Sequence, residues 1–229
     1  MKSKFLILLF LISLSNLAHA LYGARSLTQA SGLPPIVTLH LNDSSRPEFD
    51  DFCSGVLVAP DKVLTTGHCI EVVGTSAYDQ WNVLTYEPQL LKVKLGGIKY
   101  DVADVVIAPS YAEALGYAGE DLAIIKLKKP LLNIKPIKIV SRYALKPGMK
   151  ISMVARGKIA DSLITSIKTY SGNMIVFTDG SKSGACEGDS GGALLVTMGK
   201  DVMLAGILSA QSEGCERRTG VSVFPRIFL

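Results

Sequence analysis

The chain has 229 residues, of which 48% are hydrophobic, 7% aromatic and 19% charged, with a formal net charge of +4. This composition excludes an intrinsically disordered chain, and this length allows one or two domains whose cores need no metal to fold. The small excess of basic residues is weak support for nucleic-acid binding, and we expect no nucleic-acid partner.

The first twenty residues are typical of a secretory signal peptide. Lys2 and Lys4 give a basic start, residues 5–14 are almost wholly apolar, and Ala18-His19-Ala20 has the small-x-small pattern of a cleavage site. The apolar run is shorter than the roughly 20 residues needed to span a bilayer, so we expect no stable membrane insertion. Cleavage after Ala20 and secretion are expected, outside the cell or into a bacterial periplasm. An uncleaved anchor or a buried helix is the alternative interpretation.

The rest of the chain is predicted to form many short β-strands, because helical periodicity is scarce and turn residues separate short apolar or alternating runs. Gly96-Gly97 and Met198-Gly199 are two of these turn signals. This pattern indicates an all-β sandwich or barrel, with a boundary near residues 128–136, where two prolines interrupt it. The predicted strands cover residues 36–41, 55–58, 62–66, 91–95, 100–107, 122–127, 151–154, 174–177, 193–196, 202–208 and 221–223.

All four cysteines follow the predicted leader, where export implies an oxidising compartment. Cys53, Cys69, Cys186 and Cys215 allow three pairings, between which the sequence alone does not choose. Their spacing is not that of a zinc site, and only two histidines remain after the leader. We therefore expect no metal and no cofactor.

The segment Gly188-Asp189-Ser190-Gly191-Gly192 is the most informative motif. A serine flanked by glycines has little crowding, and the backbone can approach a ligand closely. A hydroxyl is a weak nucleophile and needs a neighbouring base. G-x-S-x-G also marks the nucleophile of α/β-hydrolases, but their histidine follows the serine, and here none does. The base is therefore expected upstream. His68 ends a strand-like run, whereas His40 lies within a predicted strand and is expected to be structural.

Five motifs in order resemble the chymotrypsin/trypsin-type serine proteases, over nearly the whole chain after the leader. The segment Thr65-Thr66-Gly67-His68-Cys69 resembles T-A-A-H-C of that family. The others are residues 108–111 with 120–127, which resemble H-P-x-Y and N-D-I-A-L-I-K-L; 186–192, which resemble C-x-G-D-S-G-G; 206–209 with 214–215, which resemble G-I-V-S-W-G…G-C; and 220–222, which resemble G-V-Y.

The resemblance implies a catalytic triad in the order His68, Asp121, Ser190, with the backbone N–H groups of Gly188 and Ser190 as the oxyanion hole. It implies a fold of two packed six-stranded antiparallel β-barrels, residues 21–135 and 136–229, with the site between them. We also expect the family's usual C-terminal helix to be missing, because the sequence continues only to Leu229 after the last motif. The implied disulfides are Cys53–Cys69 and Cys186–Cys215.

The resemblance also implies a route of activation. Proteases of this family need a free α-amino group that pairs with the aspartate before the serine, here Asp189. The usual I-V-G-G start is missing, and Leu21-Tyr22-Gly23-Ala24 directly follows the predicted cut. We therefore expect signal peptidase itself to create the activating terminus at Leu21.

The substrate pocket departs from the trypsin pattern. Gly184 stands where trypsins carry the aspartate that holds Arg or Lys, so the floor is expected to be neutral. We expect a small or apolar residue before the scissile bond, but Glu187 and Glu213 could favour positive charge, which leaves a basic preference open. The expected substrate-binding residues are Gly184, Glu187, Ser209, Ala210, Gln211 and Gly220.

The sequence therefore predicts a secreted, monomeric serine endopeptidase that acts on polypeptides and that a protein inhibitor could bind. Two alternatives stay open. One is a binding or adaptor protein of the same fold with little or no turnover. The other is an exported structural β-barrel without an active site, which would leave the His-Asp-Ser order unexplained.

Overall fold

The computed structural model describes residues 21–27, 34–42, 50–72, 83–109, 111, 120–170, 173–211 and 220–223. In these residues the regular structure is β-strand, apart from the short 3-10 turns η2 (Pro88–Leu90) and η3 (Arg142–Ala144). The all-β prediction is confirmed. No helix in this part of the chain is long and apolar enough to cross a membrane.

Six strands form a closed antiparallel barrel in the order β2-β3-β4-β7-β6-β5. They are β2 (Ile36–Leu41), β3 (Cys53–Ala59), β4 (Lys62–Thr65), β5 (Leu91–Leu95), β6 (Ile98–Ile107) and β7 (Ala123–Leu127). Alternate apolar side chains such as Val37, Leu39 and Val93 point inward and are fully buried. Gly96 and Gly97 join β5 to β6 with φ of 58° and 86°, the left-handed conformations that a two-residue hairpin turn requires.

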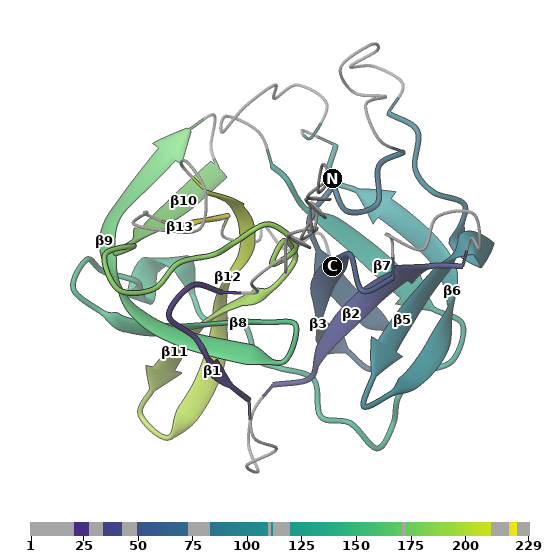
Figure 1. Ribbon diagram of the computed structural model, residues 1–229, viewed down its shortest axis with the longest axis horizontal. Helices are drawn as coiled ribbons and strands as arrows, with labels where there is room; N and C mark the ends of the chain where they lie inside the picture. The colour runs from purple at the N-terminus through teal and green to yellow at the C-terminus, as the bar shows by residue number, and fades with distance from the viewer. Residues whose placement is uncertain are drawn as a thin grey trace, which may run out of the picture.

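The second sheet contains β8 (Lys150–Ala155), β9 (Lys158–Tyr170), β10 (Asn173–Thr178), β11 (Ala193–Met198), β12 (Asp201–Gln211) and β13 (Gly220–Val223). Each pairs with its neighbour in the order β9-β10-β13-β12-β11-β8, and the pairing of β8 with β9 closes the circuit. Figure 1 shows the two bodies side by side, with the second in green and yellow. The expectation of two six-stranded barrels is confirmed.

The N-terminal segment lies with the second sheet, not with the first barrel. Strand β1 (Arg25–Ser26) pairs with β9, and Figure 1 shows it in purple along that body before the chain enters β2. The expected range of residues 21–135 for the first barrel therefore differs from the structure at its N-terminal end, where Arg25 and Ser26 belong to the second sheet. The boundary between residues 135 and 136 stays a prediction.

Strand β9 was not predicted, although it is the longest of the second sheet. Its sequence, Lys-Ile-Ala-Asp-Ser-Leu-Ile-Thr-Ser-Ile-Lys-Thr-Tyr, mixes polar residues among the apolar ones. Of the side chains of residues 158–169 in this strand, only Ala160 and Ile164 are almost fully buried. A strand with so few buried positions lacks the strict alternation on which such a prediction depends.

The two barrels meet at a shared apolar cluster. Val56 and Leu64 of the first barrel pack in one group with Leu195, Leu204 and Ile207 of the second. All five are almost fully removed from water. Burial of this kind stabilises by about 1.5–3 kcal/mol per large side chain and fixes how the loops of one barrel face those of the other.

The predicted disulfide between Cys53 and Cys69 is present and joins the first residue of β3 to the turn after β4. Cys186 is buried. Its expected partner Cys215 lies outside the described residues, so that second pairing stays a prediction.

We expect a C53S/C69S double variant to lose about 3 kcal/mol of unfolding free energy, because the bridge closes a loop with a sequence separation of 16. Urea unfolding curves extrapolated to zero denaturant, each with its own slope, would measure this loss. Ser141→Ala, at an exposed position, is the control. An unchanged midpoint in the double variant would contradict the prediction.

Candidate active site

His68 lies in a tight turn that follows the end of β4. The N–H groups of Ile70 and Glu71 both donate to the carbonyl of Gly67 at 3.0 Å. The Thr66 hydroxyl contacts the sulfur of Cys69 at 2.9 Å, and the disulfide holds the same residue from the other side. The His68 side chain is 40% exposed, so the turn presents its ring at the surface while its own backbone is fixed.

Asp121 holds this ring from the segment that enters β7. Its Oδ1 accepts the backbone N–H of His68 at 3.0 Å, and its Oδ2 lies 2.8 Å from His68 Nδ1. A carboxylate only accepts, so Nδ1 carries the proton and the neutral ring has its lone pair on Nε2. The hydroxyl of Ser209, from β12, donates to the same Oδ2 at 2.5 Å. Sequence reasoning assigned Ser209 to the substrate pocket alone.

These contacts shift the pKa values of both His68 and Asp121. Burial alone would lower the pKa of His68, but the hydrogen bond and charge of Asp121, with the charge of Glu71, outweigh it and raise the pKa. Burial would raise the pKa of Asp121, yet the His68 and Ser209 hydrogen bonds and the His68 charge hold it below its usual value. Asp121 therefore stays ionised while His68 can gain and lose a proton.

The turn around Ser190 packs closely against the first barrel. The N–H of Ser54 in β3 donates to the Ser190 carbonyl at 2.7 Å. Gly191 has a φ of 80°, and a Cβ there would lie 1.9 Å from the Ser54 carbonyl oxygen and 2.4 Å from the Thr65 hydroxyl. Only glycine fits this conformation and this approach. Because Thr65 is three residues before His68, the contact brings the serine turn to the side of the barrel that carries the histidine.

A pocket of about 230 Å³ opens beside this turn. Of the predicted pocket residues, Glu187 and Ser209 line it, whereas Gly184 forms a bridge with Tyr22 in the N-terminal segment. Gln211 lies opposite Gly220 in the pairing of β12 with β13, and the side chains of Ala210, Gln211 and Gly220 lie outside what the structure describes. Among the described residues, the lining consists of Ala185, Cys186, Glu187, Gly188, Ser190, Leu208 and Ser209.

The structure places Leu21 beside Asp189. The nitrogen of Leu21 donates to Asp189 Oδ2 at 2.8 Å, and the N–H of Cys186 donates to the same oxygen at 2.7 Å. The Leu21 side chain is 3% exposed and packs in the core of the second barrel. The bridge between Tyr22 and Gly184 fixes the segment beside it, with hydrogen bonds of 2.9 and 3.2 Å.

Asp189 is fully buried, and burial raises its pKa to about 6. The N–H groups of Cys186 and Leu21 and the charge of Arg156 oppose this rise. The second oxygen, Oδ1, has no hydrogen-bond partner among the described residues. A cation with spare protons beside this carboxylate would therefore stabilise its ionised form.

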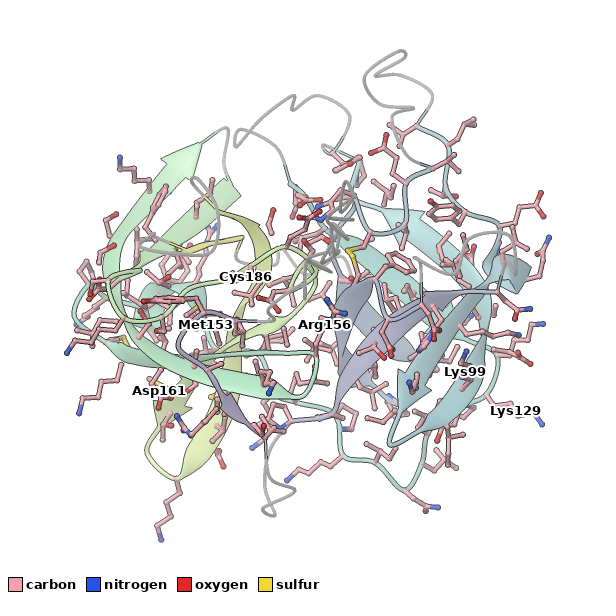
Figure 2. All side chains as sticks on the ribbon, viewed as in Figure 1. Lys99, Lys129, Met153, Arg156, Asp161 and Cys186 are labelled. Carbon is pink, nitrogen blue, oxygen red and sulfur yellow. A yellow bond between two sulfur atoms is a disulfide. The ribbon has the colours of Figure 1, made fainter. Side chains whose placement is uncertain are left out.

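Arg156 is a residue of the site that sequence reasoning missed. Its φ of 46° is unusual for a residue with a side chain. Its N–H donates to the Ser54 hydroxyl at 3.3 Å, and a Cβ on Gly188 would lie 2.4 Å from its Nη1. Figure 2 shows Arg156 at the junction of the two barrels. The following Gly157 was the only sequence signal, since it marks a tight turn between β8 and β9.

Two groups of metal-ligand side chains occur among the described residues, and neither is arranged as a metal site. Cys53 and Cys69 lie near His68 but share a disulfide. The buried His40 contacts Asp50 at Nδ1 and lies 2.6 Å from Asp51 at Nε2, so its two carboxylates face different ring nitrogens. This arrangement suits a structural histidine paired with acids.

A sequence model of the family described as Trypsin matches residues 23–228. The chain belongs to the trypsin family. Granzyme M of Rattus norvegicus is 29% identical over 191 residues, which cover 71% of this chain and 70% of the relative. A trypsin of Saccharopolyspora erythraea is 28% identical over 204 residues, covering 79% and 84%. Glucanase inhibitor protein 3 of Phytophthora sojae is 26% identical over 246 residues, covering 95% and 91%.

Membership of the trypsin family makes this chain a serine endopeptidase by class, a hydrolase with polypeptide substrates. The family resemblance read from the sequence is thereby confirmed. The individual roles of the residues within the site follow as proposals.

We expect Ser209→Ala to lower kcat/KM by about tenfold, because the loss of a hydrogen bond to a charged group costs about 1.5–3 kcal/mol. The Ser209 hydrogen bond helps to hold the pKa of Asp121 low. The ionised Asp121 carboxylate therefore stabilises the folded protein at pH values above the usual pKa of aspartate, and this stability is lost as pH falls through the lowered pKa. Acid unfolding of the variant should therefore begin at a higher pH, as followed by circular dichroism.

Ser152→Ala is the matched control, because Ser152 donates to Asp161 at 2.7 Å at an exposed position. It should leave kcat/KM unchanged. Equal effects of the two substitutions would contradict a particular role for Ser209.

Proposed function

We propose that this protein is a secreted serine endopeptidase that cleaves peptide bonds through Ser190, His68 and Asp121. The observation that carries the proposal is the pair of hydrogen bonds from His68 to Asp121, with the Ser190 turn held on Ser54 by a third. A nucleophile, a base and a group that orients the base are the three parts that acyl transfer needs.

In the proposed reaction, the Ser190 hydroxyl attacks the acyl carbon while His68 Nε2 takes its proton. His68 then gives this proton to the leaving amine, and an acyl-enzyme remains. Water, deprotonated by His68, attacks the ester and releases the acid, which restores Ser190. Asp121 keeps the proton on Nδ1 and stabilises the charged ring. The N–H groups of Gly188 and Ser190 stabilise the oxyanion, each by about 3–4 kcal/mol.

The pocket beside Ser190 supports a preference for a small or apolar residue before the scissile bond. Its volume of about 230 Å³ is modest, and its lining is mostly uncharged. Glu187 is the one charged residue among the described residues of that lining. It is exposed, so its charge acts at the rim in water, where an ion pair contributes at most about 1 kcal/mol.

Activation is proposed to need only the removal of residues 1–20. The socket for Leu21 and its contact with Asp189 support this, as does the φ of 42° at Leu21. That angle is defined by the peptide bond to Ala20, and it is disfavoured for a residue with a side chain. Cleavage after Ala20 removes this constraint and turns a neutral N–H into an ammonium beside a buried carboxylate.

We expect Ser190→Ala to abolish labelling by a fluorophosphonate probe and to lower kcat by about 10⁶-fold. Asp121→Asn should lower it by about 10⁴-fold, because the histidine would take the wrong tautomer. Mass spectrometry of the labelled wild type would identify the modified residue. Ser141→Ala, at an exposed position, should label as the wild type does. A folded wild type that takes no label would favour a binding role of the kind that the name of the Phytophthora relative suggests.

We expect a protein that begins at Leu21 to be active, and one with Gly-Ser added before Leu21 to lose activity by on the order of 10²-fold or more. A buried charge left without its partner costs about 3–5 kcal/mol. Pairing raises the pKa of the α-amine, so activity should be present below its ordinary pKa and fall as pH rises through the raised value. A secreted active protein that begins elsewhere, for example at Ser26 or Ile36, would overturn this route.

A further inference from the structure

A second carboxylate lies close to the catalytic histidine, on the turn that carries it. Glu71 is 6% exposed, and its backbone N–H closes the turn by donating to Gly67 at 3.0 Å. Its backbone also pairs with Thr85 in an isolated bridge. The backbone of Glu71 is therefore held by the turn on one side and by an extended segment on the other.

Tyr111 reaches this carboxylate from a distant part of the chain. Its hydroxyl donates to Oε2 of Glu71. Its ring lies flat against the backbone of Gly67, where a Cβ would be 2.7 Å from Cδ2 of the ring. A Cβ at position 67 would meet the ring in this structure, so the ring and the His68 turn are in close contact.

Tyr111 is itself tied to the segment that carries Asp121. Its N–H donates to the Ala108 carbonyl at 2.9 Å, and the Ala108 N–H donates to the carbonyl of Leu122 at 2.9 Å. Leu122 directly follows Asp121. The contacts of Tyr111 with Gly67 and Glu71 therefore connect the segment that carries Asp121 to the turn that carries His68. This connection is separate from the Asp121–His68 hydrogen bonds.

We propose that Glu71 and Tyr111 are positioning residues for His68: the Tyr111 ring sets the distance between the His68 turn and the Asp121 segment, and the Glu71 carboxylate holds that ring through its hydroxyl and places a second negative charge on the turn of the base. This proposal rests on the proposed function of the site. The charged groups that act on His68 are Asp121, from the segment before β7, and Glu71, from its own turn. The Tyr111 hydroxyl donates a hydrogen bond to the Glu71 carboxylate.

The charge of Glu71 is tested by Glu71→Gln, which keeps an oxygen for the Tyr111 hydroxyl and removes the negative charge. The measurements are the rate of fluorophosphonate labelling from pH 5 to 9 and the titration of the His68 ring by NMR. We expect the acid limb of the labelling profile and the His68 titration midpoint both to move to lower pH. Asp201→Asn, at an exposed position of the second sheet, should leave both unchanged.

An unchanged His68 midpoint in Glu71→Gln would overturn the electrostatic part of the proposal. The NMR titration does not require Ser190 to react. A wild type that takes no label but whose His68 midpoint moves in the variant would therefore contradict the proposed hydrolase while it supports the role of Glu71.

The positioning part is tested by Tyr111→Ala and Tyr111→Phe. The alanine variant removes the ring from Gly67 and should lower the labelling rate at least about tenfold across the pH range. The phenylalanine variant keeps the ring and should recover most of that rate. Equal rates for alanine and wild type, in proteins with matching melting temperatures, would overturn this part. If the alanine variant does not fold, the ring contact is tested with Gly67→Ala, whose added Cβ would meet the Tyr111 ring and should lower the labelling rate. An unchanged rate in a folded Gly67→Ala protein would then overturn this part.

Discussion

The site depends first on one carboxylate that is held between the two barrels. Asp121 accepts two hydrogen bonds from His68 in the first barrel and one from Ser209 in the second. An ionised group of this kind is stable away from water only when its oxygens are satisfied. Because its donors come from both bodies, the relative position of the barrels is part of the condition that keeps Asp121 charged and His68 oriented.

A second constraint is steric and acts on the nucleophile turn. The backbone at Gly191 approaches Ser54 so closely that no side chain could be accommodated. The shared apolar cluster of Val56, Leu64 and Ile207 supplies the burial that holds this contact closed. Electrostatic pairing at Asp121 thus fixes the histidine half of the site, and the close backbone approach at Gly191 fixes the serine half. The site needs both.

Much of this arrangement could be predicted from the sequence, and the exceptions have physical reasons. Strands with inward-facing Val, Leu and Ile, such as β2 and β5, were predicted with the bounds that the structure gives them. Strand β9 was not predicted, because polar residues interrupt its apolar pattern. The family motifs indicated His68 and Asp121, since each motif is local, and Leu21 followed from the predicted cleavage site. The bond from Ser209 to Asp121 and the position of Arg156 are contacts between segments far apart in sequence, for which no local pattern exists.

The pairing of β1 with β9 bears on how the protein assembles. The second sheet contains residues from both ends of the described chain, from Arg25 in β1 to Val223 in β13. A sheet of this kind cannot be completed until nearly all of the chain is available, and contacts between such distant residues make folding slow. The first barrel is formed by residues 36–127 alone and has no such dependence. During synthesis it can therefore fold first and offer the surface of Ser54, Val56 and Leu64 as a template on which the second barrel closes.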